Sequence, residues 1–467
     1  MVFPIAGGTQ DTSYEIENSL RFNDDDTAYL NRTRSSQSNT TGTFSVWTKM
    51  GNPDADNILF GGHTDVNNRS YIYFSDPTGY GGIFSRTSGS ADINFATNAL
   101  YRDPSAWYHV VVAIDTTQGT ESNRFKMYVN GEQITSFSAS SYPSQNASLP
   151  ILNQAAQTVG GGYGSSAVSA MAEGYMADAH YIDGTQYAAS DFGETNDNGV
   201  WIPKKFTGSF GTNGFKLEFK QTGTGTASAS TIGADTSGND NHLTSNNLAA
   251  LDVTEDTPTN NFCTLSSVDN DGVVLSEGNC NFDTSSGNNE GVRGTIGVQN
   301  GKWYYECKIT GSAGMSAGNI GYSRPEVPVT SGPASVLGLF ANGSSTFGLY
   351  NNSSGKTSLD ASAGIGQNDI IGVALDLDSS TKTIAYYRNG SIMGSAQTIN
   401  ASILGDFLLP VMLDDGGVND VVGSFNFGNP TFSISSGNAD ANGYGNFEYA
   451  PPSGYYSLCT KNLAEFG

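Results

Sequence analysis

Basic residues are scarce in this chain. Its 467 residues include 21 lysines and arginines against 45 aspartates and glutamates, so the formal charge is 21 − 45 = −24. Proteins that bind nucleic acid or an anionic membrane surface need a basic face. We therefore expect no nucleic-acid partner and no such membrane surface. Charged residues make up only 14% of the chain and aromatic residues 11%, so the chain is not a disordered acidic tail either.

Long apolar runs and closely spaced cysteine pairs are also missing. No apolar run approaches the roughly 20 residues that span a bilayer, so we expect no membrane insertion. Residues 1–8 contain no basic residue and the first is Arg21, so we expect no secretory signal. The four cysteines form no Cys-x-x-Cys pair, which argues against a zinc site. Whether Cys263 and Cys280 form a disulfide stays open at this stage, because the compartment is unknown.

Short strands separated by turns are the pattern that is present. Segments rich in β-branched and aromatic residues recur, for example at 43–48 and 107–114, and Gly, Asn and Asp separate them. Long helical periodicity is absent. The Asn-Gly pairs at 130–131 and 389–390 each follow a strand pattern and predict tight hairpins, because both residue types tolerate positive φ. These patterns predict an all-β fold.

The strand segments fall into two series with a polar stretch between them, which begins as a low-complexity run of Thr, Gly, Ala and Ser. We predict an extended arm over 1–12, a β-sandwich over 13–221, a polar linker over 222–262 and a second β-sandwich over 263–467. The predicted fold is therefore two antiparallel β-sandwich domains in tandem. The solvent-exposed faces and long loops of a sandwich suit the binding of a ligand or partner.

Each half contains a set of short motifs. Those of the first half are FSVW at 44–47, WYHVVV at 107–112, KMYVNG at 126–131 and GYMADAHYID at 174–183. By these motifs the first half resembles the laminin-G/concanavalin-like jelly roll. Those of the second half are GKWYYE at 301–306, IGYS at 320–323, FGLY at 347–350, DIIGVALD at 369–376, YYRNG at 386–390, LPVM at 409–412 and GSFNF at 423–427. By these the second half resembles a SPRY domain, and the two resemblances imply a jelly-roll sandwich for each half.

Further short segments lie around the join between the halves, at 190–194, 199–204, 211–215 and 256–260, and at the end of the chain, at 455–463. The segments at the join resemble structural proteins of tailed bacteriophages, and 455–463 is similar to the ending of the same proteins. The resemblance implies a non-enzymatic virion surface protein, in a tail fibre or associated with the tail, that binds a host-surface glycan or protein. It also implies other virion proteins as partners and assembly in the host cytoplasm. We further expect a homo-oligomer within the particle, because symmetric oligomers are the usual case for surface proteins.

Two other functions stay open at this stage. A purely structural role in head decoration or tail assembly is favoured by the lack of a coiled-coil or collagen-like shaft. A sandwich-fold glycosidase needs two carboxylates about 5–9 Å apart, which Glu-x-Asp-x-x-Glu on one strand commonly supplies. The nearest segments, 15–17 and 178–183, do not fit that pattern. We therefore expect no enzyme activity and name no catalytic residue.

Aromatic residues in glycine-rich loops are the candidate ligand-binding residues. A glycan site needs rings that stack on the C–H faces of sugars and polar groups that bond their hydroxyls. Tyr80 and Tyr163 lie in such loops in the first half, and Tyr350 with Asn351 in the second. We predict that these four bind the ligand. The alternative is that the rings only cover the ends of the sandwiches.

No cofactor is expected, and no metal site is named. Calcium at the acidic turn 23–26 is an open possibility, since some laminin-G-like domains bind it, although a plain surface turn is the simpler interpretation. Segment 269–272 lacks ligands at the first and twelfth positions of a calcium loop. Segment 353–357 lacks the first glycine of a phosphate-binding loop. His109 and His180 lie in apolar strand patterns, so we expect structural roles for both.

Overall fold

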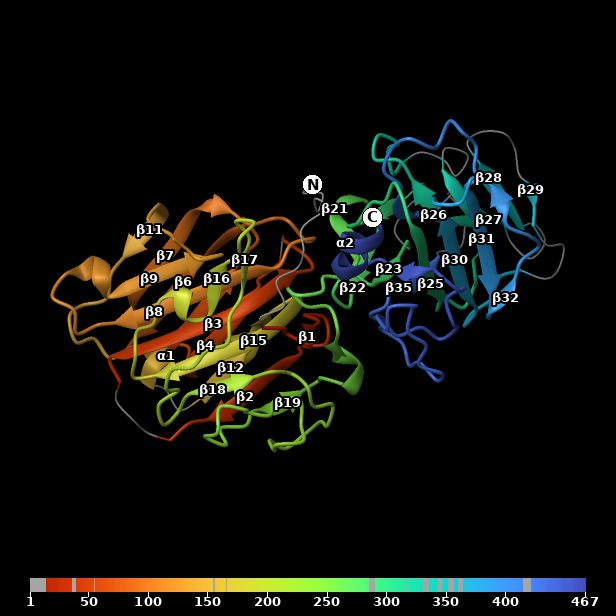
Figure 1. Cartoon of the computed structure of the whole chain (residues 1–467). Helices are drawn as coiled ribbons and strands as arrows, with labels where there is room; N and C mark the ends of the chain where they lie inside the picture. The colour runs from red at the N-terminus through yellow and green to blue at the C-terminus, as the bar shows by residue number, and fades with distance from the viewer. Residues whose placement is uncertain are drawn as a thin grey trace. The chain divides into compact units, whose positions relative to one another are not determined.

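A computed structural model describes residues 14–35, 39–53, 55–153, 156–164, 166–284, 290–315, 317–330, 336–342, 347–351, 357–359, 364–414 and 421–467. The described residues divide into two compact units, a first domain that ends at Thr259 and a second domain that begins at Asn260 (Figure 1). The predicted arm over 1–12 lies outside the described residues.

The first domain contains two large antiparallel sheets. We call them the β3 sheet and the β5 sheet. The β3 sheet runs in the order β10 (Glu132–Gln133), β9 (Phe125–Val129), β8 (Tyr108–Asp115), β3 (Thr41–Met50), β15 (Gly174–Asp183), β1 (Ser19–Phe22) and β20 (Val253–Thr254), and β18 (Phe215–Leu217) pairs with β15. The β5 sheet runs in the order β11 (Phe137–Ser141), β7 (Ser90–Leu100), β6 (Tyr80–Thr87), β5 (Asn68–Phe74), β4 (Ile58–Asp65), β12 (Ala156–Val159), β2 (Tyr29–Thr33) and β19 (Thr244–Asn246).

Shorter elements complete this domain. They are the hairpins β13 (Gly161–Tyr163) with β14 (Val168–Met171) and β16 (Gly193–Thr195) with β17 (Trp201–Pro203), the helix α1 (Pro150–Asn153), and the 3₁₀ turns η1 (Glu121–Asn123), η2 (Ala189–Asp191) and η3 (Ala250–Asp252).

The core of the first domain lies between its two sheets. Phe44 of β3 stacks on Phe60 of β4 at 4.7 Å between ring centroids, and Phe95 of β7 stacks on Phe125 of β9 at 4.3 Å. Strand β9 alternates buried and half-buried residues, as its period-two pattern predicts. Strand β8 is buried on both faces, because a second apolar cluster that includes Phe192, Phe206 and Trp201 covers the outer side of the β3 sheet.

The segment predicted as a linker over 222–262 is instead part of the first domain up to Thr259. Its strands β19 and β20 pair with β2 and β1, and Ile232 and Leu243 are fully buried in the core. Asp256 lies 2.8 Å from the ammonium of Lys49 on β3. The prediction is wrong because these pairs join residues more than 200 positions apart, which no local pattern reveals.

The second domain is also built from two sheets. One runs in the order β21 (Leu265–Asp271), β24 (Gly291–Gly294), β34 (Leu409–Asp414), β26 (Ala317–Ser323), β27 (Leu337–Asn342), β28 (Phe347–Asn351) and β29 (Thr357–Ser358). The other runs in the order β22 (Val274–Ser276), β23 (Asn281–Asp283), β35 (Val422–Asn426), β25 (Lys302–Ile309), β30 (Ile370–Asp376), β31 (Thr383–Arg388) and β32 (Ser391–Ile392); β33 (Gln397–Thr398) pairs with β31 and β36 (Tyr456–Ser457) with β25.

Aromatic residues also join the sheets of the second domain, where the ring centroids of Tyr305 on β25 and Tyr322 on β26 lie 5.5 Å apart. The chain ends in helix α2 (Thr460–Phe466). Among the described residues, no helix is long and apolar enough to cross a membrane. Two antiparallel β-sandwiches in tandem confirm the predicted fold class.

The structure shows the two Asn-Gly turns and the state of the four cysteines. Asn130 and Gly131 adopt φ values of 49° and 84° and join β9 to β10, and the pair at 389–390, with φ values of 49° and 78°, joins β31 to β32. Both hairpins are confirmed. Cys263 and Cys280, for which a disulfide was open, are buried thiols that are not bridged, and Cys307 and Cys459 are also buried and not bridged.

Candidate functional site

The outward side of strands β5 and β6 carries an unusual set of large side chains. Ile72 and Phe74 point into the core, so their neighbours Arg69, Tyr71 and Tyr73 point outward, because side chains alternate along a strand. On β6, Ile83 and Ser85 are buried, so Phe84 and Arg86 point to the same outward side. We call these five outward residues, 69, 71, 73, 84 and 86, the β5–β6 face.

Tyr73 lies along the surface of the sheet. It pairs across the strands with Gly82, and its hydroxyl donates a hydrogen bond to the carbonyl of Phe95 at 3.1 Å. A Cβ atom at Gly82 would come within 2.6 Å of the Tyr73 hydroxyl. Glycine at this position therefore leaves room for the ring to cross β6. The half-buried ring presents one side to solvent, as a stacking platform must.

Tyr71 and Phe84 continue the aromatic surface. They are direct cross-strand partners, and their ring centroids lie 5.5 Å apart. The ring of Tyr71 is also 6.3 Å from that of Tyr73. Burial raises the pKa of Tyr71 and, more strongly, that of Tyr73, so both hydroxyls stay protonated and neutral in ordinary buffers. The result is a continuous, uncharged aromatic strip.

Two guanidinium groups border this strip. The Arg69 guanidinium lies 6.0 Å from the centre of the Tyr71 ring, and the Arg86 guanidinium lies 5.6 Å from that of Phe84. Both distances are within cation–π range. On the neighbouring strand β7, Asp92 and Asn94 occupy outward positions, because Ile93 and Phe95 are buried.

Tyr163, one of the residues predicted from the sequence, lies beside the β5–β6 face. It ends β13, and its ring stacks on that of His63 at 4.5 Å between centroids. Arg69 donates hydrogen bonds from Nη1 to the carbonyls of Tyr163 and Gly164. Burial lowers the pKa of His63, which keeps its imidazole neutral near pH 7.

Tyr80 lies toward the other end of β6. A Cβ at its neighbour Gly81 would meet Phe74 and Met127 on the core side, so Tyr80 points outward. Two of the four predicted residues, Tyr80 and Tyr163, thus come from the domain that carries the β5–β6 face. Their role in ligand binding stays a prediction.

Tyr350 and Asn351 belong to the second domain, on β28. The side-chain amide of Asn351 donates to the carbonyl of Thr398 at 2.8 Å and accepts from the backbone N–H of Asn400 at 2.8 Å. These bonds fasten β28 to the 398–400 loop. The ring of Tyr350 packs edge-on to Phe340 at 5.4 Å. A structural role accounts for the Asn351 amide without a ligand.

Sequence reasoning missed most of the β5–β6 face. The signal was present, because Arg69, Tyr71 and Tyr73 recur at period two. It was ambiguous, because the alternate positions Ile72 and Phe74 are equally apolar, and periodicity alone does not say which side faces the core.

The acidic segments considered for calcium, 23–26 and 269–272, contain side chains that bond to other residues of the protein. The Asn23 side chain donates to Asp26, the backbone N–H of Asp24 donates to Glu173, and Asp269 pairs with Arg293 at 2.8 Å. Among the described residues, no group of three or more His, Cys, Asp and Glu side chains is arranged to hold a metal ion. The segment 353–357 falls largely outside the described residues.

The buried histidines have structural surroundings. His109 Nε2 lies 2.9 Å from the Ser45 hydroxyl, and Trp201 donates its indole N–H to His109 Nδ1 at 3.1 Å. That bond places the imidazole proton on Nε2. Burial lowers the pKa of His109 to about 3, so the ring is neutral. Both Ser45 and His109 are about 1% exposed, which leaves no access for a substrate.

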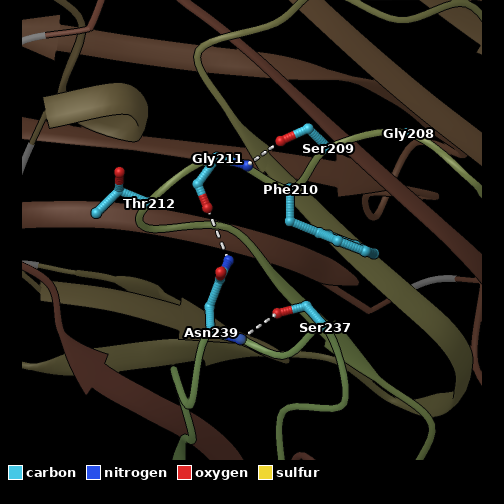
Figure 2. Close-up of a pocket in the computed structure, with 7 residues that line it drawn as sticks. All are labelled: Gly208, Ser209, Phe210, Gly211, Thr212, Ser237 and Asn239. Carbon is cyan, nitrogen blue, oxygen red and sulfur yellow. Dashed lines mark hydrogen bonds between the residues drawn. The ribbon is translucent and has the colours of Figure 1, made fainter.

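Apart from the β5–β6 face, the first domain has a polar hollow of about 490 Å³ between loops 208–212 and 237–239. Figure 2 shows that its polar groups bond to one another: Ser209 accepts from Gly211, Asn239 donates to Gly211, and Ser237 accepts from Asn239. The ring of Phe210 stacks at 5.9 Å on His180, which is buried. This hollow therefore offers fewer free binding groups than the β5–β6 face.

Solved structures share weak likeness with parts of the chain. The SPRY domain of human HERC1 is 17% identical, covers 34% of this chain and 96% of its own, and has a TM-score of 0.27. A heptameric SAP-like pentraxin from Limulus polyphemus is 14% identical, with coverages of 38% and 80% and a TM-score of 0.27. A human SPRY domain is 15% identical, with coverages of 33% and 96% and a TM-score of 0.25. No curated protein matches the chain.

Family models match each domain separately. The model described as the concanavalin A-like lectin/glucanases superfamily matches residues 22–181, and the SPRY domain model matches residues 302–429. The first match includes all of β4, β5, β6 and β7, which carry the β5–β6 face and its neighbours. The chain therefore carries a concanavalin-like β-sandwich domain followed in tandem by a SPRY β-sandwich domain.

Proposed function

We propose that this protein binds glycans, without cleaving them, through the β5–β6 face of its first domain. The observation that carries the proposal is the solvent-facing strip formed by Tyr73, Tyr71 and Phe84. Apolar rings that lie on an open sheet surface complement the C–H faces of sugars, and polar groups at the margin bond the hydroxyls. Asn94 and Asp92 on β7 supply such groups.

The dimensions of the strip suit a chain of sugars rather than a single one. From Tyr80 to Arg86 the outward positions of β6 span six residues, which is roughly 20 Å at the rise of a strand. Tyr80 then lies at one end of the strip, and the Tyr163–His63 stack lies near the other.

Binding without hydrolysis is supported by the carboxylates of this surface. A glycosidase requires a pair of them across the scissile bond. On β7, Asp92 faces outward, whereas Asp65 accepts hydrogen bonds from the backbone of Asn67 and Asn68 at the β4–β5 turn. Asp56 and Asp76 lie close enough to the strip to raise the pKa of Tyr71 and Tyr73. Asp76 accepts hydrogen bonds from the backbone N–H groups of Thr78 and Tyr80, each at 3.0 Å. We therefore propose no catalytic role. Release of reducing sugar from a bound polysaccharide, lost on Asp92→Asn, would revive the glycosidase alternative.

Substitution of Tyr73 tests the binding proposal. Purified full-length protein is screened on an array of bacterial surface glycans, and affinities for the hits are measured by titration calorimetry. Tyr73→Ala is expected to weaken binding about fivefold, since one aromatic contact contributes about 1 kcal/mol. Tyr449→Ala, a partly exposed tyrosine of the second domain, is the matched control. Equal affinity for Tyr73→Ala and the wild type would refute a site at this face.

We also propose that the protein is a surface component of a tailed-phage particle, which rests on the resemblance of the junction segments. Other virion proteins and a host-surface glycan or receptor are its proposed partners. Quantitative mass spectrometry of purified virions tests the location. A few copies per particle support a tail receptor-binding role, copies near those of the capsid protein support head decoration, and absence refutes the virion proposal.

A further inference from the structure

We propose that the ligand of the β5–β6 face is an anionic glycan, whose carboxylate or sulfate groups are bound by Arg69 and Arg86. This inference rests on the proposed function and adds the chemical class of the ligand. Its basis is a pair of adjacent arginines that form no ion pair with any described residue.

Arg69 and Arg86 are direct cross-strand partners on β5 and β6. Like charges at directly opposite positions of an antiparallel pair repel and destabilise the sheet. Among the described residues, neither arginine forms an ion pair, whereas Arg21, Arg34 and Arg293 each pair with an aspartate. Acidic side chains outnumber basic ones by 45 to 21 in this chain. Two neighbouring arginines without carboxylate partners are therefore unexpected.

Unpartnered polar atoms gather around the same pair. Within the part of the chain that the structure describes, Nε of Arg69 and Nε of Arg86 are buried and have no hydrogen-bond partner. Two more such atoms belong to outward residues of the neighbouring strands β4 and β7, namely His63 Nδ1 and Asp92 Oδ2. A buried polar atom without a partner costs free energy, and such atoms are few in native proteins. Their concentration at one end of four neighbouring strands indicates a place that a polar ligand completes.

The two guanidinium groups are held differently. Arg69 is anchored by its hydrogen bonds to the carbonyls of Tyr163 and Gly164. The Arg86 side chain has no hydrogen bond to any described residue, and its guanidinium lies near the Phe84 ring. A guanidinium supported by an aromatic ring presents its N–H edge, which matches both oxygens of a carboxylate or sulfate. Arg69 thus supplies a fixed donor group and Arg86 an adjustable one.

The aromatic strip and the arginines follow one another along the same strands. Sugar rings stacked on Tyr73 and Tyr71 would bring their substituents beside Arg69, because these three residues occupy successive outward positions of β5. The net charge of −24 opposes the approach of any polyanion, so a local positive pair is needed to bind one. The same charge disfavours nucleic acid, whose many phosphates need a wider basic surface.

Two matched pairs of polymers test the inference. Polygalacturonate is compared with its methyl ester, and dextran sulfate with dextran, by calorimetry with the full-length protein. The first pair detects carboxylate recognition and the second sulfate recognition. We expect the charged member of at least one pair to bind about tenfold more tightly, since hydrogen bonds to charged groups are the stronger ones. We also expect that preference to shrink as salt rises.

Substitution of the arginines assigns the effect. Arg86→Met is expected to abolish most of the preference, and Arg69→Met with Arg86→Met all of it. The control, Lys126→Met with Lys205→Met, removes two positive charges elsewhere in the first domain and should keep the preference. Since the Arg86 side chain makes no hydrogen bond or ion pair to any described residue, Arg86→Met should fold normally, and its melting temperature checks this.

The outcomes separate the two proposals. Equal binding of charged and neutral polymers, with binding still lost in Tyr73→Ala, overturns the anionic-ligand inference and leaves glycan binding intact. Equal loss in the lysine control also overturns it, because net charge would then explain the effect. Comparable binding of single-stranded DNA would indicate a general polyanion site and overturn it as well. No binding to any of the polymers or to the glycan array refutes the proposed function itself.

Discussion

The buried ion pair between Lys49 and Asp256 fastens the segment 222–259 to the first domain. The two charged atoms lie 2.8 Å apart, and the side chains are 1% and 0% exposed. Asp256 also accepts a hydrogen bond from the indole N–H of Trp107 at 3.2 Å. Lys49→Met would remove one charge and leave the other buried.

The expected cost of Lys49→Met follows from that burial. Breaking a buried pair by removal of one partner typically costs about 3–5 kcal/mol, because the remaining charge is uncompensated. For a domain of this size, 1 kcal/mol corresponds to roughly 2–4 °C, so the melting temperature should fall by about 6–20 °C. The double variant Lys49→Met, Asp256→Leu removes both charges and should recover most of the loss.

Hydrogen exchange with mass spectrometry on the full chain measures this effect for each domain separately. Peptides from β1, β3 and 250–259 should lose protection in Lys49→Met, and peptides of the second domain should not. Lys204→Met breaks a 45% and 44% exposed pair with Glu194 and should cost less than about 1 kcal/mol. A loss below 1 kcal/mol for Lys49→Met, or a double variant as unstable as the single one, would refute the reasoning.

Three further predictions concern single sites. Gly82→Ala places a Cβ 1.9 Å from the Phe95 carbonyl, so we expect a loss of about 1–3 kcal/mol in urea unfolding together with weaker glycan binding; a fully stable variant that binds normally contradicts the flat placement of Tyr73. Burial lowers the pKa of His180, so just below pH 6.5 the unfolded chain binds more protons than the folded one, and the free energy of unfolding decreases as the pH decreases. His180→Phe should reduce the slope of the unfolding free energy against pH by up to about 1.4 kcal/mol per pH unit, and an unchanged slope contradicts this prediction. A thiol reagent should modify no cysteine in the native protein, because all four are buried, namely Cys263, Cys280, Cys307 and Cys459. In denaturant it should modify all four, and fewer than four modified cysteines would reveal a disulfide.

Much of the fold could be predicted because its signals are local. Segments rich in β-branched and aromatic residues predicted strands, and the Asn-Gly pairs predicted two hairpins that the structure contains. Each signal involves residues within a few positions of one another. The same is true of the family motifs, which identified both sandwich domains.

The predicted linker illustrates where such reasoning stops. Residues 222–259 are rich in Gly, Ser and Thr and show no strand periodicity. Their order comes from partners far away in the chain, such as β2 for β19 and Lys49 for Asp256. Composition describes what a segment lacks and says nothing of what packs against it.

The candidate site divides in the same way. The sequence by itself determined that strands would form, that tyrosines would recur along them, and that acidic residues would dominate the chain. Only the tertiary structure decided that Tyr71 and Tyr73 face outward, that Gly82 lies beneath Tyr73, and that Arg69 meets Arg86. The physical reason is that strand alternation defines two faces, whereas pairing register and the packing of a second sheet decide which face is buried.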